Sequence, residues 1–84
     1  MRIGIAIVSS GKRLNIDADP NMLGEEVIEQ LLDAQVIQPV TLPMRYLLSF
    51  KDKNSNAMLD LGKTLEANGV EENDVLALII NGEA

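Results

Sequence analysis

The stretch Val75-Leu76-Ala77-Leu78-Ile79-Ile80 is the most apolar run of the chain, and its pairing decides the fold. A short apolar run without polar interruptions is typical of a strand in the middle of a sheet. Far from it in the sequence, residues 2–8 alternate large and small side chains, with Ile3, Ile5 and Ile7 in one register. This period of two predicts another strand with one face buried.

The residues between these two strands predict a hairpin, a helix and a third long strand. Residues 13–17 alternate again after a turn that contains Gly11, so we expect them to form a hairpin with residues 2–8. Residues 23–36 change to helical spacing. Residues 45–51 return to a period of two and predict a strand.

The last strand, residues 75–80, then has no partner left except the first strand. We expect these two to pair in parallel, because the connection that contains the helix is long enough for a parallel crossover. The predicted fold class is α+β: a mixed four- to five-stranded sheet with one helix packed across it, in the order ββαββ plus a short 3-10 turn. The fifth strand is a very short edge strand at residues 58–60, and Thr64 is a candidate N-cap for one helical turn that ends at Gly69.

The predicted helix has an uncertain start and an acidic side. Asn21 is the better candidate for the N-cap, and Gly24 disfavours helix by about 1 kcal/mol. No basic residue accompanies the acidic residues Asp17, Asp19, Glu25, Glu26, Glu29 and Asp33. This side is either a solvated surface or a docking surface for a basic partner.

The composition excludes several classes of function. The chain has 84 residues, enough for a single domain over residues 1–84, and its net charge of −6 disfavours nucleic acid as a partner. Because there is no cysteine or histidine, thiol and imidazole catalysis and the usual zinc sites are excluded. We therefore expect that the protein is not an enzyme, that it has no catalytic residues, and that it binds no metal or cofactor. A signal peptide and a membrane-spanning run are not apparent, which predicts a cytoplasmic protein without membrane insertion.

The most specific pattern is Leu59-Asp60-Leu61-Gly62-Lys63-Thr64-Leu65-Glu66-Ala67-Asn68-Gly69-Val70, followed by Asn73-Asp74-Val75-Leu76-Ala77-Leu78. It is similar to the pattern of the ubiquitin-like β-grasp superfamily, in which a Thr-Leu turn and a Gly-Val turn precede the last strand. Within that superfamily the chain most resembles the bacterial YukD/EsaB type of ubiquitin-like protein. The resemblance implies a protein-interaction module that serves as a cytoplasmic accessory of a bacterial type VII-like secretion system.

The C-terminal residues bear on an alternative function. Ubiquitin and the sulfur carriers of similar fold end in Gly-Gly, whose carboxylate is activated. This sequence has only Gly82 at that point, followed by Glu83 and Ala84. The alternative is therefore a ubiquitin-like covalent modifier or carrier that is activated after processing to Gly82.

With a ubiquitin-like register, one face of the sheet points away from the helix and offers a partner-binding surface. Its predicted apolar centre and cationic rim are Ala6, Val8, Leu47, Ala77 and Ile79, and Arg2, Arg13 and Arg45. An apolar patch with a charged rim is typical of a site for a protein partner. Alternatively, Leu47 and Ile79 are ordinary surface residues or are buried in a homodimer. A slip of one residue in the third strand would instead bury Leu47 and expose Tyr46 and Leu48.

Overall fold

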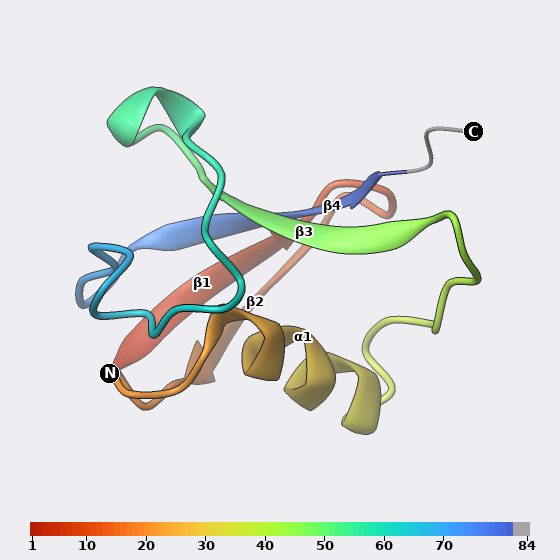
Figure 1. The fold of residues 1–84 in the computed structure, drawn as a ribbon, viewed down its shortest axis with the longest axis horizontal. Helices are drawn as coiled ribbons and strands as arrows, with labels where there is room; N and C mark the ends of the chain where they lie inside the picture. The colour runs from red at the N-terminus through yellow and green to blue at the C-terminus, as the bar shows by residue number, and fades with distance from the viewer. Residues whose placement is uncertain (82–84) are drawn as a thin grey trace.

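The computed structural model describes residues 1–81, in which one α-helix packs across one face of a four-stranded mixed sheet (Figure 1). The predicted α+β class and the order of strands and helix are therefore confirmed. The elements are β1 Arg2–Ile7, β2 Lys12–Asp17, α1 Gly24–Asp33, β3 Arg45–Phe50, the 3-10 helix η1 Asn54–Asn56, and β4 Val75–Asn81.

β4 lies inside the sheet, whose strand order is β2-β1-β4-β3. It pairs in parallel with β1, from Gly4 opposite Val75 to Ile7 opposite Leu78. It pairs antiparallel with β3, and β2 pairs antiparallel with the other side of β1. The predicted parallel pairing of the first and last strands is therefore confirmed, and β2 and β3 form the two edges.

The core lies between the sheet and α1. Ile3 and Ile5 of β1 and Leu76 of β4 have no exposed surface. Leu48 of β3 is also fully buried, whereas Leu47 is only half-buried, so the alternative register of this strand is wrong. Apart from Phe50 the core is aliphatic, and α1 contributes its apolar stripe of Val27, Ile28 and Leu31.

The segment after β3 differs in detail from the prediction. In place of a fifth strand at residues 58–60, Met58 forms a single bridge with Ser49. The 3-10 turn lies earlier, in η1, while residues 65–69 form a hydrogen-bonded turn. The hydroxyl of Thr64 accepts the N–H of Ala67 at 3.0 Å, as its predicted capping role requires. Gly69 has a φ of +84°, the left-handed conformation expected of a closing glycine.

The start of α1 is not capped by Asn21. The N-cap position is Leu23, whose N–H donates to Glu26 Oε1 at 2.8 Å. Gly24 is the first helical residue, and a Cβ built there would lie 3.1 Å from the Cα of Leu61 and 3.2 Å from its Cδ2. A side chain at this position would crowd Leu61, which accounts for a glycine where helix propensity disfavours one.

We expect Gly24→Ala to destabilise the fold although alanine is the better helix former. The backbone of Leu61 cannot easily move, because its carbonyl accepts the N–H of Glu25 at 3.0 Å. Overpacking of this kind costs about 1–3 kcal/mol, which exceeds the gain in helix propensity of about 1 kcal/mol or less. Urea unfolding measures the change, and Gly62→Ala, at an exposed glycine, is the matched control. A Gly24→Ala chain as stable as the wild type would contradict this account.

Candidate functional site

The face of the sheet that points away from α1, here called the outer face, brings together the five predicted apolar residues. Leu47 of β3 lies opposite Ile79 of β4. Val8, the residue after β1, extends the same row through a backbone hydrogen bond to β4. In the neighbouring row Ala6 of β1 lies opposite Ala77 of β4. Because alternate residues of a strand share one face, these rows form a continuous apolar strip across three strands.

Part of the outer face is a shallow depression of ≈ 340 Å³. All the predicted apolar residues except Leu47 line it. The small residues Ala77 and Ser49 are buried, whereas Val8 and Met58 are exposed by 62% and 51%. Small side chains between larger, exposed ones therefore leave a hollow with an apolar rim.

The three predicted arginines are not equally close to this depression. Arg13 of β2 lies opposite Ala6 and adjoins the apolar strip. Arg2 lies further along β1, and its Nε is 3.7 Å from a carboxylate oxygen of Asp17. Arg45 lines a different groove, between β3 and α1. Arg13 therefore adjoins the strip across the sheet, and Arg45 adjoins it at Leu47, because residues two apart on a strand share one face.

Sequence reasoning missed the contribution of residues 51–58 to the depression. Asn56 and Met58 line it, because the chain turns back over the sheet after β3. Figure 1 shows η1 raised on the side of the sheet opposite α1. The only signal in the sequence is Met58, an apolar residue that follows the polar turn of residues 52–56. Its position over the sheet depends on how that turn folds.

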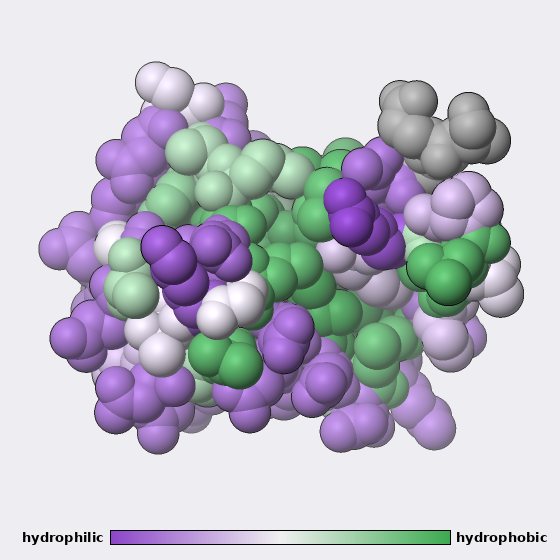
Figure 2. Space-filling model, in the orientation of Figure 1, coloured by the Kyte–Doolittle hydropathy of each residue, from purple (hydrophilic) through white to green (hydrophobic). Residues whose placement is uncertain are grey.

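A second apolar surface, the α1–β3 groove, has a volume of ≈ 420 Å³. Its apolar lining comes from α1, from β3 with the loop before it, and from Leu61. The loop contributes Leu42, which is exposed by 88%. A band of hydrophobic surface crosses the face seen in Figure 2, where β3 and α1 lie in Figure 1. The signal in the sequence is the largely apolar loop of residues 39–44. Its two prolines, Pro39 and Pro43, prevent it from continuing the helix.

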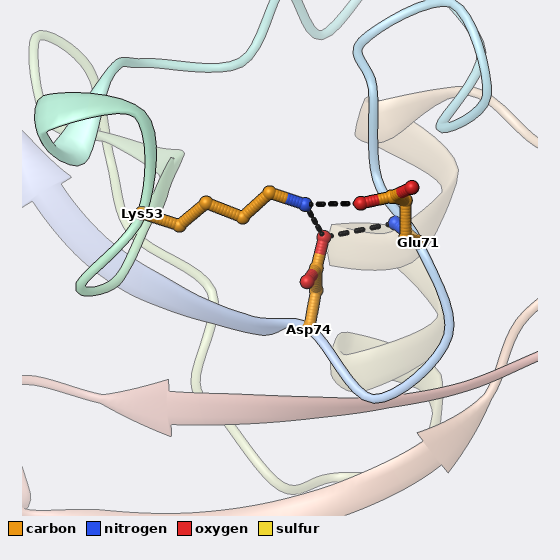
Figure 3. Close-up of polar contacts among 3 residues, drawn as sticks. All are labelled: Lys53, Glu71 and Asp74. Carbon is orange, nitrogen blue, oxygen red and sulfur yellow. Dashed lines mark hydrogen bonds and ion pairs between the residues drawn. The ribbon is translucent and has the colours of Figure 1, made fainter.

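A polar cluster holds the turn after β3 against the turn before β4 (Figure 3). Lys53 Nζ lies 2.8 Å from Glu71 Oε1 and 2.7 Å from Asp74 Oδ2, and Asp74 Oδ2 also accepts the N–H of Glu71 at 2.8 Å. Hydrogen bonds to Asp74, and then to Glu71, raise the pKa of Lys53 above its ordinary value of 10.5. Because one ammonium group contacts a carboxylate on either side of it, and the three groups together carry a net charge of −1, the cluster joins the two turns.

Within residues 1–81 no group of acidic side chains is arranged to hold a metal ion. The same residues include no helix long and apolar enough to cross a membrane. Gly82, on which the alternative of covalent activation depends, lies outside the described residues. No protein-family model matches this chain, and no curated protein matches it either.

We expect the contribution of Lys53 to stability to depend on alkaline pH. A group whose pKa is raised by folding stabilises the fold fully below its unfolded pKa and loses that effect as the pH rises through its folded pKa. The wild type should therefore be more stable than Lys53→Met at neutral pH, and the gap should close only above about pH 10. Urea unfolding of both chains across this range tests it, with Lys63→Met as the control for loss of a lysine. A gap that is absent at neutral pH would refute the expectation.

Proposed function

We propose that this chain is a non-catalytic ubiquitin-like interaction module that binds a protein partner through its outer face. The observation that carries the proposal is the row formed by Val8, Ile79 and Leu47 beside the depression over Ala6 and Ala77. Three large aliphatic side chains in one row on an uncovered sheet face leave apolar surface in water. A partner that covers this surface gains about 25 cal/mol for each Å² removed from water.

The arrangement of elements supports the ubiquitin-like part of the proposal. A β-grasp fold pairs its first and last strands in parallel at the centre of a mixed sheet and lays one helix across one face. The described residues have this pairing and this single α-helix, with four strands and two isolated bridges, Ser49 with Met58 and Leu23 with Thr64. The YukD/EsaB resemblance adds that the module is a cytoplasmic accessory of a bacterial type VII-like secretion system, which stays a prediction.

The chemistry of the outer face indicates the kind of partner. Arg13 lies beside the apolar strip, although the chain as a whole carries a net charge of −6. A matching surface has an apolar centre with an acidic group near Arg13, because complementary charges steer association and fix register. Histidine and cysteine are missing from the whole sequence, so this face has no imidazole or thiol for catalysis.

We expect Val8→Asp to weaken partner binding strongly without unfolding the chain. Val8 follows β1 and is largely exposed, so the substitution costs little stability but places a charge in the apolar strip. The matched control is Val36→Asp, which makes the same change at an exposed valine that does not line the outer face. Photo-crosslinking in the native host identifies the partner, and titration with the purified partner should then show a loss of tenfold or more, about 1.4 kcal/mol. Full binding by Val8→Asp would place the interaction elsewhere.

A second measurement separates this function from covalent modification. If the module acts by reversible binding, the chain recovered from its native host should carry no adduct at Gly82, and Gly82→Asp should bind the partner as tightly as the wild type. Intact-mass spectrometry and the same titration test these outcomes. A conjugate linked through Gly82 would favour the modifier alternative.

A further inference from the structure

β3 is an edge strand, and its backbone edge that faces away from β4 is covered only along the second half of the strand. The N–H of Phe50 donates to the carbonyl of Ala57 at 2.9 Å, and the carbonyl of Leu48 accepts the N–H of Leu59 at 2.8 Å. These bonds join β3 to the segment that carries the Met58 bridge. They end at Leu48, so residues 45–47 have no such neighbour among residues 1–81.

The direction of the backbone groups in this uncovered half follows from the alternation of the strand. Odd-numbered residues bond toward β4, since Lys51 just beyond β3 donates its N–H to Val75 at 3.0 Å. Even-numbered residues bond outward, as Leu48 and Phe50 do. The N–H and carbonyl of Tyr46 therefore point away from β4. Neither has a backbone hydrogen-bond partner on that side in the described part of the chain.

The open backbone of Tyr46 borders the α1–β3 groove. Ile28 and Leu32 of α1 line one wall of the groove, and Leu61 lies in the same lining. Leu42 reaches it from the loop before β3 with most of its surface exposed. Free strand edges recruit extended peptides, and neighbouring apolar pockets then accept alternate side chains of the added strand.

The charged residues around the groove indicate the charge that a bound ligand should carry. Glu25 and Glu29 line the groove on its α1 side, and both are exposed. Neither they nor Arg45 takes part in an ion pair within residues 1–81. The lining therefore carries two carboxylates, both on the α1 side, and one guanidinium group on the β3 side, a net charge of −1. A ligand that lies along the α1 side is favoured when basic side chains flank its apolar ones.

We propose that the α1–β3 groove binds an extended basic and apolar segment of another protein, which adds as a strand to the free half of β3. Its central residue would exchange backbone hydrogen bonds with Tyr46, its aliphatic side chains would cover Ile28 and Leu32, and flanking lysines or arginines would approach Glu25 and Glu29. This surface lies on the other side of β3 from the outer face. The proposal therefore does not depend on what the outer face binds.

A second copy of this chain is a poorer occupant of the same edge. Antiparallel pairing of two β3 strands about Tyr46 would place the two α1 helices side by side. Glu25 and Glu29 of one copy would then face the same residues of the other, and each copy carries a net charge of −6. Like charges brought together in this way oppose association.

The test uses a synthetic peptide, Lys-Lys-Val-Thr-Ile-Thr-Val-Lys-Lys, titrated into the isotope-labelled chain at low salt. We expect amide shifts concentrated at Tyr46, at the groove face of α1 and at Leu42, with no comparable change around Val8. Methylation of the backbone nitrogen of the central isoleucine removes the donor for the Tyr46 carbonyl and should abolish binding. Replacing the four lysines by glutamates should also abolish it.

Two protein variants identify the groups that make the contact. Glu29→Lys should weaken binding about fivefold, whereas Glu66→Lys, an equal charge change at an exposed site away from the groove, should change it less than about twofold. Leu42→Ser should weaken binding while Val8→Ser leaves it unchanged, and neither residue is part of the core. Binding that survives nitrogen methylation, shifts centred on the outer face, or no detectable binding would each overturn the proposal, as would self-association through β3 that excludes the peptide.

Discussion

β1 and β4 meet in parallel at the centre of the sheet, and this pairing determines where every other element lies. Antiparallel strands can be joined by a tight turn, but a parallel pair needs a long crossover. Here the connection carries α1, which packs across one face of the sheet and completes the core (Figure 1). No second α-helix of residues 1–81 covers the opposite face, so Ala6 of β1 and Ile79 of β4 remain partly exposed there.

The same pairing leaves β2 and β3 at the edges of the sheet, and the two edges are protected from further strand pairing in different ways. β2 carries Lys12, Arg13 and Asp17, all exposed, and charged side chains discourage unwanted strand pairing. β3 is protected along its second half by the segment that bridges Ser49. Its first half has one charged residue, Arg45, and adjoins an apolar groove. An edge left open beside apolar surface is a feature that favours strand addition by a partner.

Much of the fold could be predicted from the sequence because strand and helix periods are local properties. The alternation of Ile3, Ile5 and Ile7 and the apolar run of β4 identified the central pair. The capping of α1 could not be predicted in this way. Gly24 is unfavourable by propensity, and its reason lies in contact with Leu61, which is distant in the sequence.

The candidate sites show the same division between local and tertiary information. The residues that share the outer face follow from strand parity once the register is known, so all five apolar members could be named from sequence. The groove could not, because its walls come from three separate parts of the chain. Leu61 links the two cases: its carbonyl accepts the N–H of Glu25, its atoms press against Gly24, and its side chain lines the groove. The contact that fixes the start of α1 therefore also positions the helix wall of the groove relative to β3, so the shape of this surface depends on a packing constraint of the fold.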